Sequence, residues 1–232
     1  MRMMSIGRFV ACIAMAGLPL LMPAELGAQA PAPPAANPNP MPIIPPQIPA
    51  AHVVNLMTED GIRIFGAQWK NMDVKIVEAP PREGAGPKWT SSYDIQPHAG
   101  EKGFDDSKWP TIEAKALADR IGGGRLFMTW YRTNLTIPAK IGDFDTAGAI
   151  AVLTFTIDDY AEAWVNGAMP RRAGRTSPAT IQGFNIPNRV VLTEQTKAGD
   201  KFEIAILGIN GPISLAPPNP VFFREVRIEF YK

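Results

Sequence analysis

Few side chains in this sequence are able to act as a nucleophile or a base. The only cysteine is Cys12, and the two histidines are His52, beside a proline-rich stretch, and His98, which follows Pro97. Neither histidine lies in a segment patterned as a strand or helix, so we expect both in exposed loops. The G-x-S-x-G pattern that lifts a nucleophilic serine onto a sharp strand-to-helix turn does not occur. Acyl-transfer chemistry is therefore not predicted.

Two pairs of neighbouring carboxylates, Asp105/Asp106 and Asp158/Asp159, are the next candidates. Glycoside hydrolysis needs two carboxyl groups that flank one bond, whereas adjacent residues of an extended strand point to opposite faces. The pattern favours a turn or helix cap for the first pair, before Trp109, and the end of a strand for the second. A hydrolase built on either pair is not predicted, and we expect no enzymatic activity.

Sugar recognition suits the remaining polar and aromatic side chains better. A loop after the predicted hairpin turn Asn166-Gly167 carries the strongest basic cluster, which is Arg171, Arg172 and Arg175. Arginine presents a planar fork of donors, so this loop is a candidate donor set for a sugar or an acidic polysaccharide. The alternative is a solvated loop with flexible arginines.

Sugar binding also requires aromatic rings, because a sugar stacks the apolar face of its ring on an aromatic side chain. Large rings in a β-sandwich are mostly core residues that need a partner for their N–H group. One of Trp130 and Tyr131 is expected in the core, and which one stays open. Trp164 has apolar flanks in a strand-like run, so we predict a core position and a loss of roughly 3 to 5 kcal/mol on truncation to alanine. The candidate tryptophans are Trp69, Trp89, Trp109, Trp130 and Trp164.

Short β-type runs must position these residues. Period-two alternation is clear in residues 201–206 and 226–230, where one face is apolar and the other polar. The one helical candidate of any length is Ile112–Arg120. Many strands with few helices predict an all-β sandwich or barrel. The predicted strands are Ile62–Trp69, Val74–Glu78, Leu126–Ile137, Ala149–Ile157, Tyr160–Val165, Arg189–Leu192, Lys201–Ile209 and Val221–Tyr231.

The first 50 residues have a different composition. Arg2 and Arg8, the apolar run Phe9–Met22 and small residues up to Ala30 follow the plan of a secretory signal peptide over residues 1–30. The run is shorter than the roughly 20 residues that span a bilayer, so no integral membrane segment is expected in the mature chain. Residues 31–50 are rich in proline and uncharged, which predicts an extended linker before a domain at 51–232.

Net charge and cysteine content limit the binding partners and the cross-links that we expect. Removal of Arg2, Arg8 and Glu25 with the signal peptide leaves equal numbers of basic and acidic side chains in the mature chain. Nucleic-acid binding is not predicted, because such proteins carry a basic excess on one face. Loss of Cys12 leaves no cysteine, so stability has to come from the core without disulfides.

Three segments, taken in order, resemble the galactose-binding-like jelly roll: residues 104–109 (FDDSKW), 130–138 (WYRTNLTIP) and 158–167 (DDYAEAWVNG). That fold includes the sugar-binding domain of family 2 glycoside hydrolases. The sequence is more closely similar to the N-terminal, non-propeller domain of some bacterial gluconolactonase-like proteins, and this resemblance covers residues 51–232. The segments that carry the closer similarity are 68–69, 75–78, 183–190, 210–214 and 230–231.

The resemblance implies a jelly-roll β-sandwich that binds ligands at its loop-bearing edge. It assigns the arginine loop to that edge with Asn166 and Asn210, and Tyr131 as an adjacent ring. Jelly rolls of this kind often hold calcium for structure, for which Asp158 and Asp159 are the oxygen donors predicted here. Residues 51–232 contain no propeller domain with lactonase metal ligands, so lactonase activity is not expected.

Three hypotheses for function follow. The first is an exported, non-catalytic module, periplasmic or secreted, that binds carbohydrate or a sugar-derived ligand. The second is a protein-interaction module that works with a separate gluconolactonase-like or glycoside hydrolase enzyme. The third, favoured least, is a hydrolase in its own right.

Overall fold

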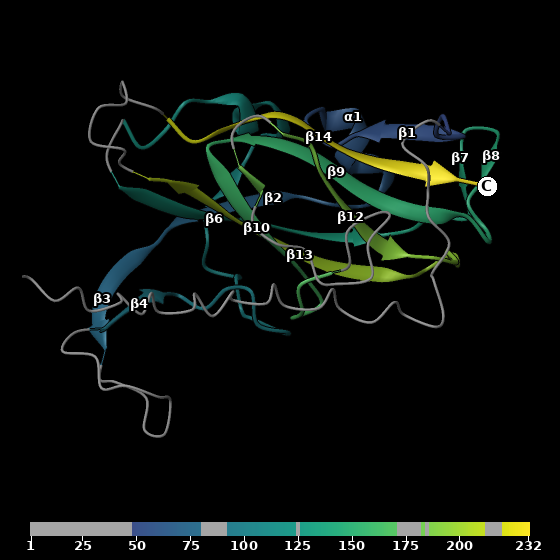
Figure 1. Cartoon of the computed structure of the whole chain (residues 1–232). Helices are drawn as coiled ribbons and strands as arrows, with labels where there is room; N and C mark the ends of the chain where they lie inside the picture. The colour runs from purple at the N-terminus through teal and green to yellow at the C-terminus, as the bar shows by residue number, and fades with distance from the viewer. Residues whose placement is uncertain (1–47, 80–91, 124–125, 171–181, 184–185, 212–219) are drawn as a thin grey trace, which may run out of the picture. The chain divides into compact units, whose positions relative to one another are not determined.

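Two antiparallel β-sheets make up most of the described chain (Figure 1). The computed structural model describes residues 48–79, 92–123, 126–170, 182–183, 186–211 and 220–232. The first sheet has four strands, in the order β1 (His52–Asn55), β14 (Phe222–Tyr231), β9 (Ile150–Asp158) and β12 (Asn188–Thr193). This sheet joins the first described strand to the last.

The second sheet has six strands, and β9 and β10 are consecutive strands that belong to different sheets. Its order is β11 (Gln182–Gly183), β10 (Tyr160–Val165), β13 (Lys201–Asn210), β6 (Phe127–Thr136), β2 (Trp69–Asp73) and β5 (Thr111–Ile112). Two separate ribbons pair β3 (Lys75–Ala79) with β4 (Ser92–Gln96), and β7 (Lys140–Ile141) with β8 (Phe144–Asp145). The predicted all-β sandwich is confirmed.

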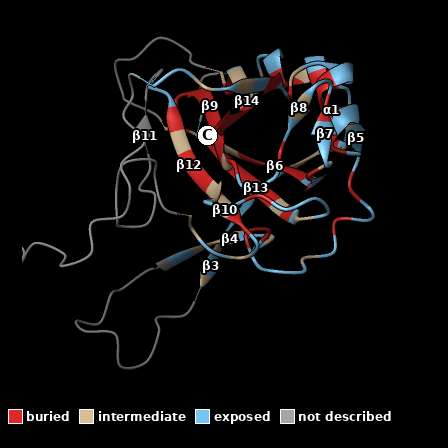
Figure 2. Cartoon of the chain, turned by 90° about the vertical axis from the view of Figure 1, so that its right-hand side faces the viewer, coloured by how far each residue is buried: buried red, intermediate tan, exposed pale blue. Residues whose placement is uncertain are grey.

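The core lies between the two sheets, where buried residues gather in Figure 2. Leu153, Phe155 and Ile157 of β9 are buried in the same cluster as Ile204 and Ile206 of β13. These residues are two apart because successive side chains of a strand point to opposite faces. Each large apolar side chain buried here contributes roughly 1.5 to 3 kcal/mol, which makes this cluster the main source of stability.

A second apolar cluster, called the outer cluster below, lies on the outer face of the six-stranded sheet. It combines Trp130, Ala205 and Leu207 of the sheet with Ala99 and Trp109, which come from the segment between β4 and β5. The outer face of β6 and β13 is thus covered by another part of the chain, whereas a one-sided sheet would leave it to water.

A buried ion-pair network fastens that covering segment. The Arg132 Nε donates to Asp106 Oδ2 at 2.9 Å, and its Nη1 donates to the carbonyl of Ala99. Lys70 Nζ donates to Asp106 Oδ1 at 2.8 Å and to the Asp106 carbonyl at 2.7 Å. Burial pushes the pKa of Asp106 upward, but these hydrogen bonds outweigh it and hold the pKa below its ordinary value.

The predicted strand Ile62–Trp69 is wrong, because the chain forms the short helix α1 (Glu59–Ile64) before β2 begins at Trp69. Thr58 caps the helix by accepting a hydrogen bond from the Gly61 N–H at 3.1 Å. Glu59 and Asp60 in the first turn complement the helix dipole. The cap and the acidic turn outweigh the β-branched residues that suggested a strand.

The predicted helix Ile112–Arg120 is only partly correct. Thr111–Ile112 is the edge strand β5, and the 3₁₀-helix η1 follows over Ala114–Ala118. β1 and β4 were not predicted. His52 was expected in a loop, but it lies in β1 and stacks on Phe144 with ring centroids 5.1 Å apart.

The predicted turn at Asn166-Gly167 is confirmed. Both residues have positive φ, 51° and 83°, and Val165 bridges to Ala168 across the turn. Most other predicted strands agree with the structure to within one or two residues. Among the residues described, no helix has the length and apolar character needed to cross a membrane.

Candidate ligand-binding site

The two asparagines expected at one loop-bearing edge lie near opposite ends of β13. Asn166 follows β10, and its Oδ1 accepts from the Glu203 N–H at 2.8 Å, whereas Asn210 is the last residue of β13. Seven residues separate Glu203 from Asn210, which is about 23 Å along a strand. Asn166 and Asn210 therefore do not share a site, and Arg171, Arg172 and Arg175 lie outside the described residues.

Tyr131 is a core residue and offers no face to a ligand. Its side chain is 2% exposed, and its ring packs edge-on against Phe223 with centroids 4.9 Å apart. Burial raises the pKa of its hydroxyl well above the ordinary value. Trp130, its neighbour, points the other way into the outer cluster, so both rings are buried on opposite faces of β6.

The core position predicted for Trp164 is also wrong. Ala161, Ala163 and Val165 are the β10 side chains that face the core, and the alternation turns Trp164 outward. There it packs against the outer cluster, partly buried, close to Gly100. Its Nε1 donates to Glu162 Oε2 at 3.3 Å.

Asp158 and Asp159, the predicted calcium donors, are both buried at the junction of β9 and β10. Asp158 Oδ2 accepts from Arg224 Nη2 at 3.0 Å, so one of its oxygens already has a cationic partner. Within the described ranges, no group of three or more histidine, cysteine, aspartate or glutamate side chains is arranged to hold a metal ion. Calcium binding stays a prediction.

The structure brings another set of residues together in a hollow at the edge of the outer cluster. The hollow has a volume of about 510 Å³ and lies where β2 ends, β3 begins and β4 ends. It is named the Trp109 pocket below. Its lining residues are Met72, Asp73, Lys75, Gln96, Pro97, His98 and Trp109.

The apolar wall of this pocket is held firmly. The Trp109 ring is 9% exposed and packs edge-on against Phe104 with centroids 5.5 Å apart. Trp130 Nε1 donates to the Pro97 carbonyl at 2.9 Å, which ties the β4 end of the pocket to β6. The ion pairs of Asp106 fix the chain just before Trp109. The pocket wall is therefore held in place by contacts within the chain.

Three polar side chains around this wall have unused hydrogen-bonding capacity. Asp73, Lys75 and Gln96 are exposed, and no described residue forms a hydrogen bond or ion pair with their side chains. Lys75 and Gln96 are brought side by side as the first register pair of β3 and β4. A carboxylate accepts, an ammonium donates and an amide does both, so the three cover both roles of a hydroxyl group.

His98 adds an imidazole group to the rim. Its Nε2 lies 2.8 Å from Asp94 Oδ2, and its Nδ1 lies 3.5 Å from Glu101 Oε1. The hydrogen bond to Asp94 is the largest cause of a pKa raised above the ordinary histidine value. As expected from the sequence, His98 is an exposed loop residue, and both its nitrogens face carboxylates instead of a nucleophile.

Sequence reasoning named Trp109 as one of five candidate rings and did not find its partners. Lys75 and Gln96 are 21 positions apart in the sequence, and their proximity depends on the pairing of β3 with β4. The β-branched residues Val74, Ile76 and Val77 are a usable signal for β3, but β4 contains too few apolar residues to stand out.

No family model matches this chain, and no curated protein matches it. Similar solved structures include β-glucuronidase 2 of Bacteroides uniformis, with 14% identity, a TM-score of 0.44, and coverage of 77% of this chain and 18% of that one. A β-glycosidase from Bacteroides vulgatus has 16% identity, a TM-score of 0.43, and coverage of 77% and 20%. A glycosyl hydrolase family 2 member from Bacteroides cellulosilyticus has 18% identity, a TM-score of 0.36, and coverage of 71% and 20%.

This chain thus spans about a fifth of the length of these enzymes. Identities and TM-scores at this level bear on no ligand, activity or partner of the chain. The similarity to the gluconolactonase-associated domain stays a prediction.

Proposed function

We propose that residues 51–232 form an exported, non-catalytic module that binds carbohydrate in the Trp109 pocket. The proposal rests on Lys75 and Gln96, which pair in the β3–β4 register, have no side-chain partner among the described residues and line a pocket walled by a tryptophan. Small-molecule sites combine an apolar lining with a few placed polar groups. A sugar presents an apolar C–H face and a set of hydroxyl groups, and this pocket offers a complement to both.

Glycan-array binding with residues 31–232, with and without calcium, tests the proposal first. The double variant Lys75→Ala, Gln96→Ala is then compared with the wild type on the strongest glycan by calorimetry. A hydrogen bond to a charged group is worth about 1.5 to 3 kcal/mol, so the double variant is expected to bind at least tenfold more weakly.

A matched control is available at the other end of the sandwich. Lys140 and Gln195 are also exposed, and their side chains have no hydrogen-bond or ion-pair partner among the residues described. Lys140→Ala, Gln195→Ala should bind as the wild type does. Equal affinity in all three proteins would reject the Trp109 pocket as the site, and silence across the array with folded protein would reject carbohydrate binding.

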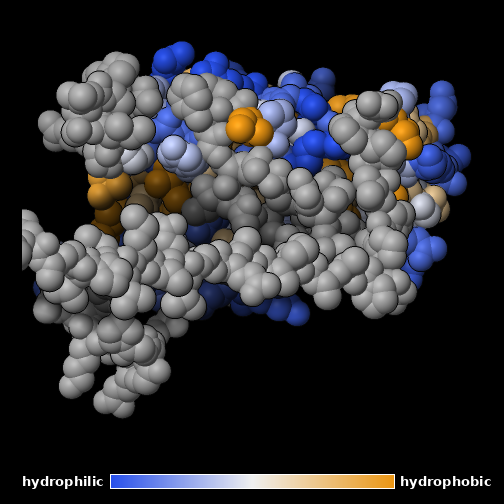
Figure 3. Space-filling view, in the orientation of Figure 1, coloured by the Kyte–Doolittle hydropathy of each residue, from blue (hydrophilic) through white to orange (hydrophobic). Residues whose placement is uncertain are grey.

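A protein-interaction module is the second candidate, favoured by the β3–β4 ribbon. Tyr93 is 71% exposed and Ile76 is 43% exposed, and the register places both on one face of the ribbon. β3 and β4 pair only with each other among the described strands, which leaves open edges suited to strand addition. Hydrophobic side chains also show at the left end of Figure 3, where β6 begins and Leu126 is half exposed.

The variant Ile76→Lys, Tyr93→Lys separates the two candidates. If the module docks onto a purified gluconolactonase-like or glycoside hydrolase enzyme, the variant should lose that binding while glycan binding is kept. Unchanged docking would remove the ribbon from consideration.

A further inference from the structure

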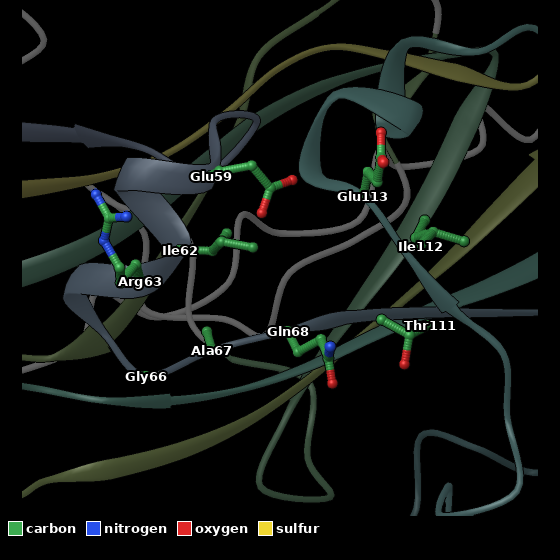
Figure 4. A pocket seen from close by; sticks show the side chains of 9 residues that line it. All are labelled: Glu59, Ile62, Arg63, Gly66, Ala67, Gln68, Thr111, Ile112 and Glu113. Atoms are coloured by element: carbon green, nitrogen blue, oxygen red, sulfur yellow. The ribbon is translucent and has the colours of Figure 1, made fainter.

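A second hollow lies between α1, β5 and η1, at the other end of β2 (Figure 4). Its volume is about 420 Å³. Ile62, Ala67 and Ile112 supply apolar surface, while amide, hydroxyl and carboxylate groups come from four polar side chains. These are Glu59, Gln68, Thr111 and Glu113.

The walls of this hollow are tied together across it. Glu59 Oε1 of α1 accepts from the Ala114 N–H at 2.8 Å, which joins the helix to the start of η1. Ile62 and Leu117 lie buried in the main core beneath these two elements. At Gly66 the chain leaves α1 with φ of 59°, a conformation that favours glycine. The hollow is therefore part of the packed fold.

Gln68 and Thr111 have unused hydrogen-bonding groups on its rim. Both are exposed, and neither side chain has a hydrogen-bond partner among the residues described. They lie on neighbouring segments, since Thr111 pairs with Lys70 and Ile112 pairs with Trp69 in the β2–β5 register. Figure 4 shows the side chains of Gln68 and Thr111 on the same side of these two segments.

The two hollows lie at opposite ends of β2. β2 runs from Gln68, which precedes it, to Met72 and Asp73 at its end, and the chain from Trp109 to Thr111 runs beside it in the opposite direction. Gln68 and Met72 share one face of β2 by the period-two rule, and four residues separate them by about 13 Å. Between them Lys70 is held by Asp106.

We infer that the carbohydrate bound by this module is a chain long enough to reach both hollows, and not a mono- or disaccharide. The inference rests on the proposed function. Each hollow is lined by apolar side chains and by an amide side chain without a partner among the described residues, Gln96 in one and Gln68 in the other. One sugar ring in each hollow requires further rings between them.

Calorimetry with the cello-, manno- and galacturonic-acid oligosaccharide series, from one to six units, tests the inference. Within a series that binds, affinity is expected to rise at least tenfold from the disaccharide to the hexasaccharide. In Gln68→Ala, Thr111→Ala that rise with length should be lost, whereas Lys140→Ala, Gln195→Ala should keep it.

The outcomes distinguish this inference from the proposal on which it rests. Equal affinity for short and long members, still weakened by Lys75→Ala, Gln96→Ala, would overturn the inference and leave the Trp109 pocket as a small-sugar site. A rise with length that survives in Gln68→Ala, Thr111→Ala would also overturn it. No binding by any member would overturn both. Unchanged thermal melting of the variants confirms that each is folded.

Discussion

The two faces of the six-stranded sheet are covered in different ways. Toward the four-stranded sheet, β6 and β13 present side chains such as Tyr131 and Ile206, which are fully enclosed by apolar neighbours. Toward the outside they present Trp130, Arg132 and Leu207, which are covered by a single segment of chain fastened with ion pairs. The first arrangement leaves no room for a ligand, whereas the second ends in a pocket with unpaired polar groups.

Stability and recognition are therefore divided between opposite faces of the same strands. A substitution on the inner face should act on folding. One at the rim of the outer face should act on binding, and one inside the outer cluster should show some of both. The predictions below test that division, from the largest effect to the smallest.

Truncation in the inter-sheet core should cost the most. Phe155 is 1% exposed and packs edge-on toward Phe223 with ring centroids 6.1 Å apart. We expect Phe155→Ala to lower the free energy of unfolding by about 3 to 5 kcal/mol, measured by denaturant unfolding. A loss under about 1 kcal/mol would contradict the core assignment.

Removal of the buried guanidinium should cost somewhat less. Arg132→Leu leaves Asp106 with Lys70 alone and frees the carbonyl of Ala99 from its donor. We expect a loss of about 3 kcal/mol, at the lower end for a broken buried pair, because Lys70 still neutralises the carboxylate. Lys140→Ala serves as a surface control, and equal stability of Arg132→Leu and wild type would show that the covering segment is held by other contacts.

Trp164→Ala should be milder than its sequence suggested. Because the ring lies partly exposed on the outer cluster, we expect a loss of about 1 to 2 kcal/mol instead of a full core truncation. The same unfolding experiment measures it. A loss as large as that of Phe155→Ala would place the ring back in a fully buried site.

The pH dependence of the pocket rim should be the smallest effect. His98 has a raised folded pKa, so the stabilisation from its pairing with Asp94 is complete below the unfolded pKa and is lost as pH rises through the folded value. Proton NMR titration should give His98 a pKa above the ordinary 6.5, and Asp94→Asn should lower it. An unchanged pKa in that variant would remove Asp94 as the cause.

Much of the fold followed from the sequence because β9, β13 and β14 carry clear apolar or alternating runs. The misplaced strand at Ile62–Trp69 shows the limit, since a cap at Thr58 outweighed the pattern. The residues of the Trp109 pocket could not be predicted from the sequence pattern. Lys75, Gln96 and Trp109 meet only through strand pairing and through the Asp106 network, and neither has a local signal.

The most direct test of the account is an NMR titration of the folded module with the strongest glycan from the array. We expect the indole N–H of Trp109 and the side-chain amide of Gln96 to shift together at the lowest glycan concentrations. The side-chain amide of Asn166, which contacts the opposite end of β13 at Glu203, should not shift. Shifts centred on Asn166, with Trp109 and Gln96 unchanged, would contradict binding in the Trp109 pocket.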